Sequence, residues 1–194
     1  MFSNQLYHLC SVNSKTALHL LHERLFDLLF INLYLINMTT TAQTITELDQ
    51  FYIIGVSVRT SNQNNQSQKD IGELWGRFLT HNLIENIPNK ETSDVYCVYT
   101  DYESDHTGPY TTIIGCRVSS IDEIPADFVA ITVPKSKYDV YQSEGKLPDC
   151  VAETWHTIWA AGRANRKYAA DFDVYGANSQ NPEQAEVDTY VSVR

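Results

Sequence analysis

Two segments of the chain, 80 residues apart, carry the same helical pattern. They are IGELWGRFL at residues 71–79 and VAETWHTIW at residues 151–159. Aligned without gaps, they agree in residue character at four positions: Ile71 with Val151, Glu73 with Glu153, Trp75 with Trp155, and Phe78 with Ile158. An internal repeat constrains the fold strongly, because each copy has to build an equivalent structural unit.

Extended segments flank both helices in the same order. Runs of β-branched and aromatic residues predict strands at 51–58, 95–102 and 111–118 in the first half, and at 127–133, 137–142, 171–176 and 187–193 in the second. Each half therefore contains the order strand–helix–strand–strand, and the second half has one further extended piece at 137–142. Two such βαββ units predict an α+β fold, in which one antiparallel sheet carries both helices on one face. A central cleft is expected where the halves meet.

The first predicted helix has a clear apolar face. Its apolar residues fall at helical spacing: Ile71, Leu74, Trp75, Phe78 and Leu79. Asp70 and Glu73 resemble a capping box, so the helix is expected to begin at Asp70. Glu73 and Glu153 occupy equivalent positions, and we assign them helix-end roles rather than a paired-carboxylate catalytic role.

The first 37 residues differ from the rest of the chain. Residues 17–36 are strongly apolar, but Glu23, Arg24 and Asp27 interrupt them, so neither a membrane span nor a secretory signal is expected. An accessory helix, a weak membrane-surface anchor and a non-native upstream translation all remain open. We favour the last, because Met38 begins a polar run that leads into a strand. The expected domain is therefore 38–194, preceded by an extension at 1–37.

The acidic charge of the chain limits the kinds of function that it can have. The formal net charge is −10, and all of it falls on residues 38–194. The nearest basic patch is Arg163, Arg166 and Lys167, which is too small for a nucleic-acid footprint, so direct DNA binding is not expected. The four cysteines show no metal-ligand spacing, and His81, His106 and His156 form no catalytic or metal motif. No metal and no cofactor are expected, and reduced thiols favour the cytoplasm.

Several segments together resemble the GyrI-like, or AraC-type, effector-binding family. They are VYCVYTDYESDHTGPYTTIIGCRV at 95–118, the strand at 127–133, AETWHTIWAAG at 152–162, and DFDVYG at 171–176 followed by EVDTYVSV. The resemblance spans roughly residues 45–194. It implies a duplicated βαββ fold like that of the ligand-sensing domains of multidrug-responsive transcription regulators. The chain is most similar to the stand-alone members carried on integron cassettes.

The resemblance also implies a pocket between the halves for bulky, often cationic and aromatic, small molecules. Many relatives place a buried Glu in a strand motif Phe–Glu–x–Tyr, and this chain has Phe172-Asp173-Val174-Tyr175. Asp173 is one methylene shorter than that Glu, so Glu186 is the alternative acid. Strand alternation places Asp173 on the opposite face from Phe172 and Val174.

Aromatic side chains are the expected lining of such a pocket, since they offer flat apolar area and cation–π attraction. The candidate ligand-binding residues are Asp173, Trp75, Trp155, Trp159, Tyr99, Tyr110, Tyr175 and Glu186. The helix spacing of the tryptophans is equally typical of core residues. Tyr99, Tyr102 and Tyr110 are also compatible with a structural role.

The sequence thus predicts a stand-alone protein that senses or sequesters a cationic or amphipathic small molecule and is not an enzyme. Any regulatory role would then pass through a protein partner, such as a regulator or gyrase. Two alternatives remain. One is a gyrase-inhibitor-like interaction module. The other is a hydrolase of strained cyclopropane-containing compounds, in which Asp173 acts with Tyr99 or Tyr175.

Overall fold

The computed structural model describes residues 44–162 and 165–194, which form a curled eight-stranded antiparallel sheet and two helices. The first half contains β2 (Phe51–Ser61), α2 (Gln66–Thr80), β3 (Val95–Thr100) and β4 (Pro109–Val118). The second contains β6 (Ser136–Gly145), α3 (Asp149–Ala160), β7 (Ala170–Tyr175) and β8 (Ala185–Val193). Two short strands, β1 (Thr44–Leu48) and β5 (Val129–Val133), precede the halves. The interpretations of residues 1–37 lie outside the described residues.

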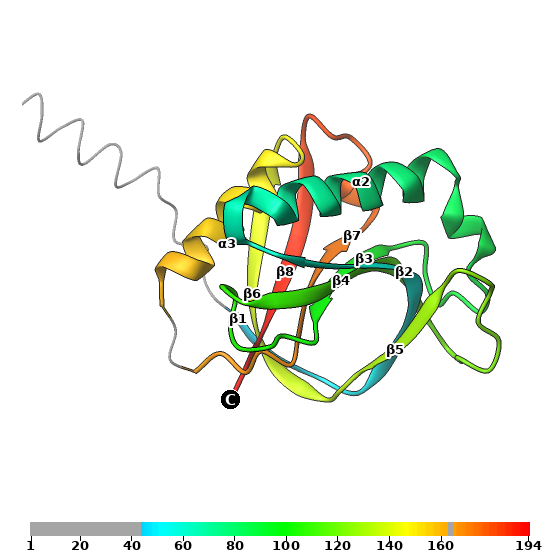
Figure 1. Ribbon diagram of the computed structural model, residues 1–194, viewed down its shortest axis with the longest axis horizontal. Helices are drawn as coiled ribbons and strands as arrows, with labels where there is room; N and C mark the ends of the chain where they lie inside the picture. The colour runs from blue at the N-terminus through cyan, green and yellow to red at the C-terminus, as the bar shows by residue number, and fades with distance from the viewer. Residues whose placement is uncertain (1–43, 163–164) are drawn as a thin grey trace, which may run out of the picture. The chain divides into compact units, whose positions relative to one another are not determined.

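The order of the strands confirms the duplication. The sheet runs β1-β6-β8-β7-β3-β4-β2-β5, so each strand of one half has its counterpart at the mirrored place in the other. The halves meet where β3 pairs with β7, and Cys97 lies opposite Asp173 in that register. Both helices lie on the same side of the sheet (Figure 1). The predicted α+β fold with two βαββ units is therefore confirmed.

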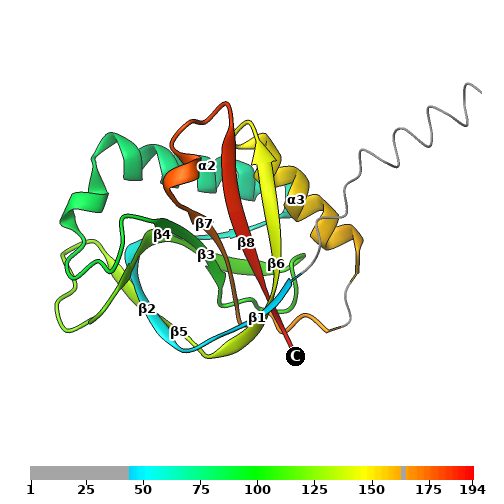
Figure 2. The same cartoon turned by 180° about the vertical axis from the view of Figure 1, so that it is seen from behind.

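The two short strands exchange between the halves. β1 precedes β2 in the chain but pairs with β6, and β5 precedes β6 but pairs with β2 (Figure 2). Leu48 lies opposite Ser136 and Phe51 lies opposite Val133, so the two exchanges have equivalent registers. The sequence did not predict β1, because its polar residues give no core signal. Short edge strands such as these limit unwanted pairing with other chains.

α2 begins earlier than the sequence predicts. It starts at Gln66, after Asn65 in the left-handed conformation, so the capping box at Asp70 and Glu73 is wrong. Asp70 instead lies within the helix, where its carboxylate accepts hydrogen bonds from Thr60 Oγ1 and Gln66 Nε2, both at 2.7 Å. Its proton affinity falls accordingly, since these hydrogen bonds lower the pKa of Asp70.

The apolar face of α2 is narrower than predicted. Leu74 and Phe78 are buried, whereas Leu79 is 66% exposed. At 3.6 residues per turn, Leu79 lies about 140° around the helix from Leu74, which turns it away from the sheet. Leu79 is therefore not a core residue.

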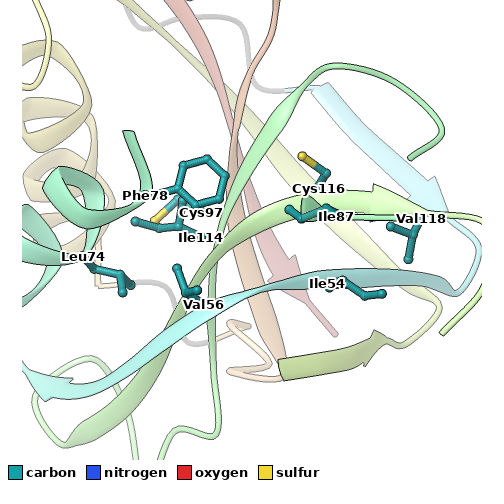
Figure 3. Close-up of a cluster of buried hydrophobic side chains, with 9 residues drawn as sticks. All are labelled: Ile54, Val56, Leu74, Phe78, Ile87, Cys97, Ile114, Cys116 and Val118. Atoms are coloured by element: carbon teal, nitrogen blue, oxygen red, sulfur yellow. The ribbon is translucent and has the colours of Figure 1, made fainter. Parts of the chain in front are cut away.

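Separate cores fill the two faces of the sheet. Figure 3 shows the cluster beneath α2, which consists of Ile54, Val56, Leu74, Phe78, Ile87, Cys97, Ile114, Cys116 and Val118. A second cluster lies beneath α3, and a third, which contains Phe51, Tyr138 and Phe172, fills the face away from the helices. Neither described helix is long and apolar enough to cross a membrane. The sheet is thus a rigid platform under both helices.

Candidate ligand-binding groove

A groove of about 560 Å³ is lined by residues from both helices and from the strands beneath them. Its volume lies in the range that suits a drug-sized molecule. The helices contribute Ser67, Gln68, Ile71, Gly72, Trp75, Asp149, Val151, Ala152, Trp155, His156 and Trp159, and the other described lining residues are Asn62, Asn65, Tyr99, Tyr102, Tyr110, Pro148 and Tyr175.

The sequence repeat is visible in this lining. With the helices aligned 80 residues apart, three pairs of equivalent positions in α2 and α3 line the groove: Ile71/Val151, Gly72/Ala152 and Trp75/Trp155. Gln68 of α2 corresponds in the same way to Pro148, which immediately precedes α3 and also lines the groove. The same face of each helix is therefore used. The repeat determines the walls of the site as well as the fold.

Two crossed aromatic pairs form the centre of the groove. The ring of Trp75 meets that of Tyr175 edge to face, with centroids 4.9 Å apart. Trp155 meets Tyr99 in the same way at 5.0 Å. Each tryptophan thus contacts the tyrosine that comes from the central strand of the other half. This T-shaped geometry is the favourable one for aromatic rings.

The remaining predicted aromatic residues join the same site. Trp159 lies next to Trp155, with ring centroids 6.1 Å apart. The ring of His106 stacks on Trp159 at 5.6 Å, and the ring of His156 lies at 5.4 Å. Tyr110 packs against Tyr99 and donates its hydroxyl to Asn62 Oδ1 at 2.7 Å. All six aromatic residues predicted for the site therefore line the groove.

Asp173 lies directly beneath two of these aromatic residues, Tyr99 and Trp155. The carboxylate is fully buried and accepts hydrogen bonds from Thr189 Oγ1 at 2.6 Å, Tyr99 Oη at 2.7 Å and Trp155 Nε1 at 3.2 Å. It is on the helix side of β7, whereas Phe172 packs on the other face, as strand alternation predicts. Asp173 does not line the groove itself, because Tyr99 and Trp155 lie between it and the open space.

The hydrogen-bond partners of Asp173 are all neutral. Burial raises the pKa of Asp173 to about 6, and the bonds from Thr189, Tyr99 and Trp155 partly oppose this rise. The same burial raises the pKa of the Tyr99 hydroxyl and of the Cys97 thiol, so both stay protonated. Asp173 is therefore a buried carboxylate with no cationic hydrogen-bond partner in the described part of the chain.

Asp171, two residues earlier on β7, has a different role. Its carboxylate receives Arg166 Nη2 at 2.6 Å, Tyr102 Oη at 3.0 Å and the backbone N–H of Ser192 at 2.7 Å. Both Arg166 and Asp171 are buried. Among the described residues, a cation thus pairs with Asp171, whereas Asp173 has only neutral hydrogen-bond partners.

Glu186 lies away from the groove. It is exposed, on the face of β8 opposite to Val187 and Thr189, and it accepts a hydrogen bond from Asn178 Nδ2 at 2.8 Å. The structure therefore does not bring it together with the other predicted residues. The sequence offered the signal: Glu186 stands between Ala185 and Val187, whose small and apolar side chains indicate that the inward face of β8 belongs to them.

The sequence analysis missed several residues of the site. Thr189 was not selected, because a threonine on a strand has no distinctive pattern, yet it makes the shortest hydrogen bond to Asp173. Gly72 and Ala152 lack a functional side chain but line the groove. The described lining includes no Lys or Arg, and its acidic member, Asp149, is exposed in the first turn of α3. The groove therefore presents a neutral to negative surface to a ligand.

Comparison with known proteins agrees with this architecture. Residues 44–193 match the family model of the integron-associated effector-binding proteins. The chain belongs to this family. It is also 30% identical over 154 residues to YobU of Bacillus subtilis, which is named as a candidate transcriptional regulator, and the match covers 77% of this chain and 96% of that protein. Family members are thus described by effector binding and regulation rather than by a reaction.

Solved structures show the same fold. An integron cassette protein of Vibrio cholerae has a TM-score of 0.62 and 28% identity, and the match covers 78% of this effector-binding chain and 95% of that one. The protein SAV2435, solved bound to tetraphenylphosphonium, has a TM-score of 0.67 at 20% identity and covers 78% and 93%. A transcription-regulation protein of Staphylococcus aureus has a TM-score of 0.65 at 16% identity, over 79% of this chain and 99% of its own.

Proposed function

We propose that this effector-binding protein holds a bulky aromatic cation in the groove between α2 and α3, with Asp173 as the countercharge. The observation that carries the proposal is the burial of Asp173 without a cationic hydrogen-bond partner in the described residues. An ionised carboxylate is costly to bury alone, and a cation delivered by the ligand compensates that cost.

The aromatic walls supply the second part of the affinity. Trp75, Trp155 and Trp159 all line the groove, and a cation over an aromatic face gains roughly 0.5–2 kcal/mol. Tyr99 and Trp155 donate hydrogen bonds to Asp173, which increases the electron density of both rings. Asp173 therefore attracts the cation without touching it, because Tyr99 and Trp155 lie between the carboxylate and the ligand.

Binding fits this geometry better than catalysis does. General acid–base chemistry needs a group within hydrogen-bond reach of the substrate. Asp173 is fully buried, and Tyr99, which separates it from the groove, already uses its hydroxyl hydrogen in a hydrogen bond to it. The tetraphenylphosphonium bound to SAV2435 supports a bulky aromatic cation as the ligand class. We therefore propose a stand-alone sensor or sequestering protein, in which any regulatory effect passes through a protein partner.

Fluorescence titration with rhodamine 6G, a cationic aromatic dye, tests this function. We expect Asp173→Asn to weaken binding of the dye more than tenfold at pH 7.5, while binding of neutral Nile red changes little. Glu186→Gln is the matched control, because it removes one negative charge from the same sheet but outside the groove. Equal rhodamine affinities for wild type and Asp173→Asn, or an equal loss in Glu186→Gln, would contradict the countercharge role.

A further inference from the structure

Gly72 occupies an unfavourable place for a glycine. It lies inside the 15-residue helix α2, which begins at Gln66 and ends at Thr80. Glycine is the least favourable residue other than proline in a helix interior, because its backbone loses the most conformational freedom. Its helical conformation does not require glycine either. α2 contains a second interior glycine, Gly76, but of the two only Gly72 is among the described lining residues of the groove.

Gly72 has open space beside it on the groove wall. Gly72 lines the groove, and a Cβ atom placed on it would meet no atom of the rest of the protein within 4 Å. The repeat places Ala152 at the equivalent position of α3, and Ala152 also lines the groove. About one turn later on each helix, the lining residue is a large one, Trp75 on α2 and Trp155 on α3. The two smallest lining residues, Gly72 and Ala152, thus occupy equivalent positions on α2 and α3.

We propose that Gly72 and Ala152, as the small residues of the two helix walls, set the width of the groove and thereby allow it to admit bulky aromatic ligands. This inference rests on the proposed function, and it names two residues that determine which ligand sizes the groove admits. A Cβ atom at Gly72 would meet no other atom of the protein within 4 Å, so a larger residue there can begin to fill the groove without displacing a neighbour of its Cβ. Ala152 is exposed and lines the groove at the equivalent position of α3.

A graded series at Gly72 tests the inference with two probes, tetraphenylphosphonium and neutral Nile red. Gly72→Ala is expected to weaken binding modestly, and Gly72→Leu more than tenfold for both probes. The melting temperature should rise in both variants, because alanine and leucine favour a helix interior over glycine. Ala152→Leu examines the opposite wall and should cause a similar loss of binding.

Two controls separate filling of the groove from other effects. Gly76→Ala makes the same change of helix propensity at a glycine outside the described lining, and Glu73→Leu adds a leucine to an exposed position of α2. Both should bind as wild type does. Wild-type affinity in Gly72→Leu and Ala152→Leu, an equal loss in Glu73→Leu, or no binding of either probe by the wild type would overturn the inference. If Gly72→Leu loses Nile red but the wild type shows no preference for tetraphenylphosphonium, the size selection stands and the proposed charge selection fails.

Discussion

Cys97 on β3 and Asp173 on β7 lie directly opposite each other at the junction of the two halves, and both are fully buried. The repeat makes these positions equivalent, since the same shift of 76 residues relates Tyr99 to Tyr175. The aromatic pairs above them are alike on both sides. The acid is present on one side, under Tyr99 and Trp155. A nearly symmetrical groove thus carries its negative charge off centre.

The buried acid should make the protein less stable at neutral pH. The pKa of Asp173 is about 6 in the folded state, above its ordinary value of 3.8, so its protonated form favours folding. This contribution is fully present below pH 3.8 and is lost as the pH rises through 6. Asp173→Asn, which cannot ionise, should gain about 3 kcal/mol relative to wild type between pH 4 and pH 7.5. Urea unfolding of both proteins at several pH values measures this difference, and a difference independent of pH would contradict it.

Cation binding should depend on pH in the opposite direction. A cation prefers the ionised carboxylate, so affinity for tetraphenylphosphonium should rise as the pH increases through about 6, while affinity for Nile red stays flat. Tyr99→Phe removes a hydrogen bond that stabilises the ionised form and should move the midpoint to higher pH. Tyr175→Phe, at the equivalent position, should leave the midpoint in place. Calorimetric titration with tetraphenylphosphonium between pH 5 and 8 measures the midpoint of this pH dependence. Identical midpoints in the two variants would contradict the stabilisation of ionised Asp173 by Tyr99.

The neighbouring acid should behave as a structural group. Arg166→Met leaves Asp171 buried without its cation, and removal of one partner of a buried pair costs about 3–5 kcal/mol. Lys135→Met is the control, since Lys135 forms its ion pairs with Glu47 and Asp49 at the surface. Urea unfolding should show a large loss for the first variant and little change for the second. Comparable losses of unfolding free energy in both variants would mean that the buried Arg166–Asp171 pair stabilises the fold no more than a surface pair does.

The boundaries of the binding unit can be tested by truncation. Residues 38–194 should bind tetraphenylphosphonium as the full chain does, because every described lining residue falls within them. A chain that begins at Asp49 lacks β1 and leaves the edge of β6 without its partner. Its melting temperature should fall in a thermal-shift assay. Unchanged stability on loss of β1 would show that the exchanged strand is dispensable.

The sequence allowed much of this site to be predicted because its determinants are local and repeated. The helical spacing around Trp75 and Trp155 places both residues on inward faces, and the alternation of β7 places Asp173 on the helix side. The exchange of β1 and β5 could not be predicted, since strand partners are decided by tertiary packing and not by the strands' own residues.

Two errors show where local patterns mislead. Asp70 and Glu73 have the spacing of a capping box, yet the hydrogen bond from Thr60 of β2 gives Asp70 a tertiary role within α2. Glu186 was selected as an acid near the ligand, although the residues on either side of it point inward. The burial of Asp173 beneath Tyr99 and Trp155 could not be predicted from a sequence pattern either, because it depends on contacts between the two halves.

A crystal structure of the complex with tetraphenylphosphonium tests the central claim most directly. The account predicts that the phosphonium centre lies between the Trp75–Tyr175 and Trp155–Tyr99 pairs, with Asp173 as its nearest carboxylate. A cation bound outside the groove, or one in the groove whose nearest acid is Asp149, would contradict the assignment of Asp173 as the countercharge.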